Sequence, residues 1–82
     1  MTWNYRIIKD KRGDMALHEA YYDNATDHCP SITVNPISFT ADAEEGKAGI
    51  VDSLRWALRD AEKLPVLKLA QLERQWAKKK KR

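Results

Sequence analysis

Two short runs of side chains in this sequence have the composition of chemical sites: His18-Glu19 and Asp27-His28-Cys29. A histidine beside a carboxylate suits general acid–base catalysis, provided that both groups reach the same proton. Aspartate, histidine and cysteine are all metal ligands, and a structural zinc site needs four ligands, usually as two spaced pairs. Whether either run can act depends on the elements that hold it.

The first pair lies in residues 15–22 (MALHEAYY), which we interpret as a β-strand because a polar, glycine-containing loop typical of a hairpin precedes it. Neighbouring residues of a strand point to opposite faces of the sheet. The side chains of His18 and Glu19 therefore cannot share a substrate, and we expect His18 to be packed or solvated on one face of the sheet.

The second run lacks the partners that a metal site needs. The chain has one cysteine and two histidines in all, so no second pair of ligands is available. No helix N-terminus is predicted beside Cys29 to activate it as a nucleophile. Only three glycines occur, and the common phosphate-binding and hydrolase motifs are missing. We therefore expect no enzyme activity, no cofactor and no metal.

The first half of the sequence predicts a small antiparallel sheet. Residues 3–8 (WNYRII) alternate apolar and polar side chains with a period of two, the pattern of a half-buried strand. Residues 9–14 form the hairpin loop to the strand at 15–22, and residues 31–34 resume a strand pattern. Pro36 cannot donate a hydrogen bond to a neighbouring strand, so this third strand lies at a sheet edge or breaks there. Three strands joined by short loops predict an antiparallel meander.

The second half of the sequence predicts helices. Residues 42–45 (DAEE) have the spacing of an N-terminal capping box, and apolar residues then recur on one helical face, at Ile50, Leu54, Ala57, Leu58 and Ala61. Pro65 ends this helix and can begin another. The second helix has a narrow apolar stripe, made by Val66, Leu69, Leu72 and Trp76.

The expected fold is therefore α+β, a three-stranded antiparallel meander followed by one packed helix (β-β-β-α). We place this domain at residues 1–64, a short C-terminal helix at 65–77, and a disordered basic tail at 78–82. A length of 82 residues fits one small domain. A lone cysteine favours a reducing compartment, no run approaches 18 apolar residues, and the N-terminal residues do not read as a secretory signal. A cytoplasmic protein that does not bind membranes is expected.

The aromatic residues of the strands indicate an interaction surface. One helix covers only one face of a sheet, so some aromatic side chains should remain on the other face, and Tyr and Trp are enriched in binding hot spots. We select Trp3, Tyr5, Tyr22 and Trp76 as candidate protein-binding residues. The same aromatic face could instead form a homodimer or pack internally.

Positive charge gathers at the C-terminus. Residues 1–77 carry ten Lys/Arg and twelve Asp/Glu, a net charge of −2, and the last five residues add +5. Such a run is often only solvated, but it can also bind nucleic acid without sequence preference by neutralising phosphates. The candidate residues for nucleic-acid binding are Lys78, Lys79, Lys80, Lys81 and Arg82.

The chain resembles a family of small uncharacterised bacterial proteins in four segments: WNYRII at 3–8, LHEAYYD at 17–23, NPIS at 35–38 and PVL at 65–67. The resemblance spans residues 3–67 and implies no established activity. The β-β-β-α order is also similar to the N-terminal domain of HicB-type antitoxins, which binds a toxin protein. The 17 residues after Pro65 are too few for the DNA-binding domain that such antitoxins commonly carry.

The sequence therefore predicts a small, non-enzymatic protein-binding or regulatory module of bacterial or phage type, antitoxin-like or inhibitor-like. Its partner would dock on the aromatic sheet face or on the C-terminal helix. The alternative is a nucleic-acid or ribonucleoprotein accessory protein that acts through its basic tail.

Overall fold

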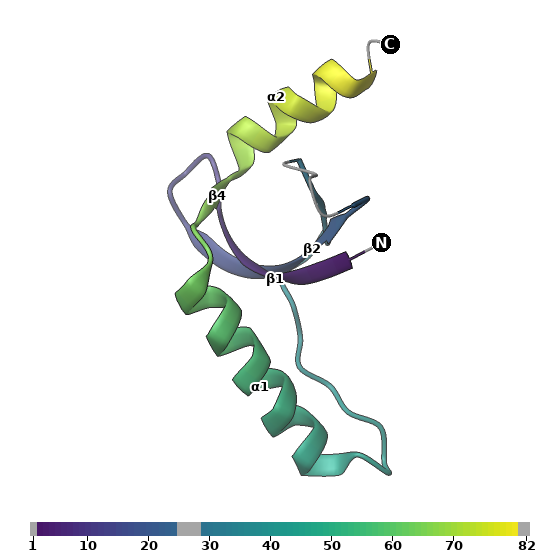
Figure 1. Cartoon of the computed structure of the whole chain (residues 1–82). Coiled ribbons are helices and arrows are strands. Elements are labelled where there is room, and N and C mark those ends of the chain that lie inside the picture. Colours follow the sequence, from purple (N-terminus) through teal and green to yellow (C-terminus); the bar gives the residue numbers. More distant parts are fainter. Residues whose placement is uncertain (1, 25–28, 81–82) are drawn as a thin grey trace.

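The computed structural model describes residues 2–24 and 29–80. They form one four-stranded mixed sheet and two α-helices (Figure 1). The elements in chain order are β1 (Thr2–Lys9), β2 (Met15–Tyr22), β3 (Ser31–Ile32), α1 (Gly46–Lys63), β4 (Leu67–Lys68) and α2 (Leu69–Lys80). The α+β class is confirmed, whereas the three-stranded meander is only part of the observed sheet.

The centre of the sheet is the hairpin of β1 and β2, as the alternation of residue types predicts. The two strands are antiparallel and pair over their full length, from Thr2 opposite Tyr22 to Lys9 opposite Met15. Asp10 closes the turn, because its Oδ1 accepts hydrogen bonds from the backbone N–H groups of residues 12 and 14 at 2.9 and 3.0 Å. The turn also uses Gly13, whose φ of 94° is unfavourable for other residues.

The outer strands are short. The sheet order is β3-β2-β1-β4, so β3 lies at an edge, as Pro36 predicts. The segment after β3 continues along β2, since the N–H groups of Thr33 and Ile37 donate to the carbonyls of Glu19 and Leu17. At the other edge, β4 pairs parallel to β1 through Leu67 and Lys68. The predicted meander omitted this strand, which lies between Pro65 and α2.

The first helix begins three residues later than the capping box predicts, with its N-cap at Glu45 instead of Asp42. Asp42 Oδ1 accepts a hydrogen bond of 2.8 Å from the N–H of Glu45, which stabilises the turn before the helix. Glu45 occupies the N-cap position without a side-chain cap, and helix α1 starts at Gly46. The helix ends at Lys63, and Leu64 is extended (φ −102°, ψ 142°), as its position before a proline predicts.

The sheet curls strongly, so that one face is convex and the other concave. Figure 1 shows α1 packed against the convex side and α2 crossing the open, concave side. Helix α2 starts at Leu69 and continues to Lys80, whereas the sequence placed this helix at 65–77 and a tail from residue 78. None of the helices in the described part of the chain is long and apolar enough to cross a membrane.

Each face of the sheet has its own small core. On the convex side Tyr5 of β1 packs with α1, where Ala57 is the fully buried helix residue. On the concave side Ile8 and Ala20 are buried, and Leu72 of α2 is only 2% exposed. The predicted apolar face of α1 is only partly buried, because Leu54 and Leu58 remain 47% and 61% exposed.

Gly49 allows the loop before α1 to pass close to the first helical turns. A Cβ atom at this position would lie 2.8 Å from Cβ of Glu45 and 3.1 Å from Cβ of Ala41. We therefore expect Gly49→Ala to destabilise the fold by about 1–2 kcal/mol through overpacking. Intrinsic helix propensity alone would stabilise this variant by about 1 kcal/mol.

Thermal unfolding of the unchanged chain and of Gly49→Ala checks this prediction. Ala48→Gly, at the exposed neighbouring position, is the control for propensity and should lower stability by about 0.5–1 kcal/mol. A higher melting temperature for Gly49→Ala than for the unchanged chain would contradict the close approach.

Candidate functional site

A row of four aromatic rings crosses the convex face of the molecule. Trp3 and Tyr5 are alternate residues of β1 and point to this face, Trp56 comes from α1, and Phe39 comes from the segment between β3 and α1. The centroids of Trp56 and Trp3 are 5.9 Å apart with an interplanar angle of 24°, so these rings stack. Trp3 meets Tyr5 edge to face at 5.1 Å, and Tyr5 lies 6.0 Å from Phe39.

The exposure of these rings differs along the row. Tyr5 is only 7% exposed and Phe39 is half-buried, whereas Trp3 is 42% and Trp56 is 51% exposed. Tyr5 therefore belongs to the core, and the two tryptophans form an indole pair at the surface. We call Trp3 and Trp56 together the tryptophan pair.

The position of α1 over β1 fixes this pair. The N–H of Tyr5 donates a hydrogen bond of 3.0 Å to Oδ2 of Asp60, one helical turn after Trp56. That N–H lies on the same edge of β1 as β4, at a position that β4 does not reach because it pairs only with Ile8 and Lys9. A buried N–H needs an acceptor, so the carboxylate of Asp60 both satisfies this backbone group of β1 and holds α1 against the strand.

The other candidate binding residues lie elsewhere. Tyr22 is on the concave face, where its hydroxyl donates to Oδ1 of Asn4 at 3.0 Å and accepts from Nη1 of Arg6 at 2.9 Å. Trp76 projects from α2, and its Nε1 donates to the carbonyl of Pro30 at 3.0 Å. The four residues selected from the sequence thus do not form one surface, although Trp3 and Tyr5 are neighbours.

Trp56, the second member of the tryptophan pair, is not among the residues selected from the sequence. It lies beside the apolar stripe that predicts the buried face of the helix, so periodicity gives no reason to select it. The available signal was its residue type, because tryptophan is strongly enriched in binding hot spots.

The residues considered for catalysis or metal binding are separated by the sheet. His18 is buried on the concave face and bonds to Thr33, whereas Glu19 is on the convex face and accepts from the hydroxyl of Tyr21. Cys29 is half-buried, and Asp27 and His28 lie outside the described residues. Within residues 2–24 and 29–80, no group of three or more acidic, histidine or cysteine side chains is arranged to hold a metal ion.

The basic C-terminal residues are only partly described. The backbone of α2 is helical as far as Lys80, and Lys78 is exposed. Arg74, one turn before Lys78, is exposed as well, so two cations share this side of the helix. Lys81 and Arg82 lie outside the described residues. Nucleic-acid binding through residues 78–82 stays a prediction.

Comparison of the chain with protein-family models, with curated proteins and with solved structures gave no match.

The tyrosines beside the tryptophan pair have raised pKa values. The pKa of Tyr21 lies above its usual value near 10 mainly because its hydroxyl donates a hydrogen bond to the carboxylate of Glu19. For Tyr5, burial is the main cause of a raised pKa, and the charge of Glu19 adds to it. A hydrogen bond with Ser53 acts in the opposite direction and does not cancel these effects.

This arrangement predicts a loss of stability in alkali. Because both folded-state pKa values are raised, tyrosines of the unfolded chain ionise first, near pH 10, and the folded state loses stability as the pH rises from there through the folded pKa values. Glu19→Gln removes the charge, so we expect it to lower the pKa of both tyrosines and to make this loss less steep. Absorbance titration of tyrosinate and unfolding midpoints between pH 8 and pH 12, about two units on either side of 10, measure the two effects.

Tyr22→Phe is the control variant, because Tyr22 lies on the other face of the sheet and bonds to Asn4 and Arg6 instead of Glu19. The effect of Glu19→Gln should be the same with and without Tyr22→Phe. An unchanged tyrosine titration in Glu19→Gln would contradict the contact between Glu19 and Tyr21.

Proposed function

We propose that this chain is a small, non-enzymatic protein-binding module that docks a partner protein through the tryptophan pair. The observation that carries the proposal is the stack of Trp3 on Trp56, at 5.9 Å, with both rings about half exposed. Large aromatic side chains are usually buried to a greater extent than these two. Two that share one exposed surface mark a place where a partner can bury apolar area.

The tryptophan pair is also rigid, which favours binding. The ring of Trp3 packs edge to face with that of Tyr5. Trp56 belongs to α1, and the hydrogen bond from the N–H of Tyr5 to Asp60 holds α1 against β1. Rings that are already held in place lose little conformational freedom when a partner covers them. Hot-spot residues are most often Trp, Tyr and Arg, surrounded by residues that contribute less.

A regulatory role, antitoxin-like or inhibitor-like, is the specific form of this proposal. It is supported by the small size of the chain and by the resemblance of its predicted strand and helix order to a toxin-binding domain. In that form the partner is a different protein, and the tryptophan pair would occupy an apolar recess on its surface.

The proposal predicts that Trp56→Ala weakens partner binding by more than about 1 kcal/mol, a loss of at least fivefold in affinity. Trp56 is half exposed, so the variant should stay folded, which circular dichroism checks. Partners are captured from a lysate of the source cells with the unchanged chain and with each variant. A captured protein that is present in a one-to-one ratio with the unchanged chain is taken as the partner. Its dissociation constants for the unchanged chain and for each variant are then measured by calorimetry.

Leu58→Ala is the matched control, because Leu58 is on the same helix and 61% exposed but has no ring contact. Capture should be lost with Trp3→Ala and Trp56→Ala and kept with Leu58→Ala. Equal affinity of all four proteins for the partner would contradict the proposal. So would a concentration-dependent dimer that Trp56→Ala dissociates, since the surface would then bind a second copy of this chain.

A further inference from the structure

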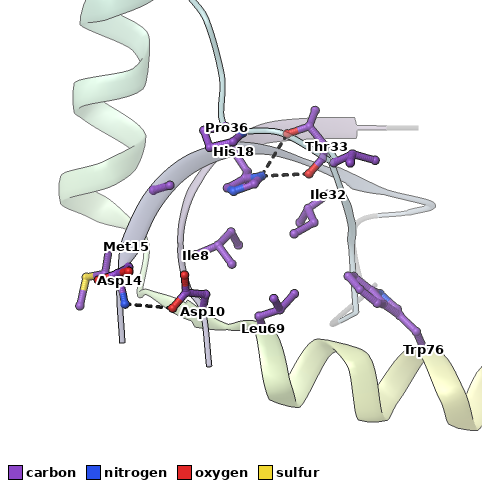
Figure 2. Close-up of a pocket in the computed structure, with 12 residues that line it drawn as sticks. Ile8, Asp10, Asp14, Met15, His18, Ile32, Thr33, Pro36, Leu69 and Trp76 are labelled. Carbon is purple, nitrogen blue, oxygen red and sulfur yellow. Dashed lines mark hydrogen bonds between the residues drawn. The ribbon is translucent and has the colours of Figure 1, made fainter. Parts of the chain in front are cut away.

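A cavity lies on the concave side of the sheet, between the strands and α2, and has a volume of about 450 Å³. This volume is within the range of pockets that hold small molecules. Its walls are mostly apolar, with Ile8 and Ala16 from the hairpin, Ile32 from β3, and Leu69 and Trp76 from α2. Figure 2 shows the side chains of Ile8, Ile32 and Leu69 facing a common space from several sides.

His18 is the buried polar side chain of this cavity. The residue is 9% exposed, and its Nδ1 lies 2.9 Å from the carbonyl oxygen and 3.2 Å from Oγ1 of Thr33 (Figure 2). A carbonyl oxygen can only accept, so Nδ1 must donate its proton to Thr33. In the neutral ring the other nitrogen, Nε2, then carries a lone pair.

That lone pair has no donor within the described part of the chain, because both hydrogen bonds of His18 are made by Nδ1. The ring projects into the same space as Ile8, and Nε2 lies on the side away from Thr33 (Figure 2). Nε2 is therefore accessible from the cavity, and a ligand that bonds to its lone pair must offer a donor, an O–H or an N–H.

The remaining polar groups of the cavity narrow the class of ligand. Asp10 and Asp14 line its end near the hairpin turn, and carboxylates accept hydrogen bonds and repel anions. The Nε1 donor of Trp76 is engaged by the carbonyl of Pro30. The side chains thus offer acceptors and negative charge, which disfavours carboxylate and phosphate ligands and favours a donor. The apolar walls favour an uncharged donor over a cation, because burying a charge against them carries a large desolvation cost.

We propose that this cavity binds a small, uncharged aromatic molecule with one hydroxyl group, and that the hydroxyl donates to Nε2 of His18. The ring would lie against Ile8, Leu69 and Trp76. This site is separate from the tryptophan pair, which is on the opposite face of the sheet, and it does not rest on the proposed protein-binding function.

The full chain, labelled with ¹⁵N, is titrated with 4-ethylphenol and, as the probe without a donor, with ethylbenzene. Binding in the cavity should shift the amide signals of Ile8 and Leu69 and the indole signal of Trp76, and leave those of Trp3 and Trp56 unchanged. No shift with either probe at millimolar concentration, or shifts centred on the tryptophan pair, would overturn the site.

The role of His18 is tested by His18→Phe, which keeps a ring in place but removes the acceptor. The affinity for 4-ethylphenol should fall about tenfold, consistent with loss of one hydrogen bond, while that for ethylbenzene changes by less than about twofold. An equal change for both probes would overturn the assignment of the hydroxyl to Nε2.

Two further measurements keep the test decisive if His18→Phe does not fold. Ala16→Leu adds bulk to the cavity wall and keeps the imidazole of His18, and it should abolish binding of both probes. In the unchanged chain the Nε2 resonance of His18 should move with 4-ethylphenol and stay in place with ethylbenzene. Retained binding in Ala16→Leu, or an Nε2 resonance that ignores 4-ethylphenol, would overturn the proposal.

Discussion

The outer edge of β1 is the constraint on which the arrangement of both helices depends. Only Ile8 and Lys9 of this edge pair with β4, so its other polar groups need side-chain partners. Asp60 accepts the N–H of Tyr5, and the guanidinium of Arg6 donates to the carbonyl of Pro65 at 2.7 and 3.2 Å. These contacts join residues that are far apart in the sequence. They hold α1, and the segment between α1 and β4, against β1.

The length of the hairpin explains why the molecule has two small cores. Two eight-residue strands twist and curl when long neighbours do not flatten them, and here β3 and β4 contribute only two residues each. One helix can then pack outside the curl and one across its opening. Helix α2 makes this closure with few contacts: Leu72 is buried, Trp76 bonds to Pro30, and Lys11 pairs with Glu73 at 2.8 Å. A single helix across a curved sheet does not fill the space beneath it, and the cavity remains.

The sequence predicts those elements that local pattern determines. The hairpin follows from alternation and turn residues, and the end of α1 follows from Pro65. Strand β4 could not be predicted in this way, because two residues carry no periodicity and parallel pairing with β1 depends on the intervening helix. Trp56 was missed for a related reason: its value as a surface residue comes from stacking on Trp3, a contact across 53 positions of the chain that helix periodicity does not encode.

The strand alternation that separates His18 from Glu19 also separates the two proposed binding surfaces. Tyr5 and Trp3 point to the convex face, whereas Ile8 and the residues opposite it point to the concave face. A partner on the tryptophan pair and a molecule in the cavity therefore never touch. The two surfaces share the β1–β2 hairpin, since Trp3 and Ile8 both belong to β1. Within that strand, Arg6 bonds to Tyr22 on the concave face and to the carbonyl of Pro65, just after α1. The hairpin therefore connects the helix that carries Trp56 with the strands that line the cavity.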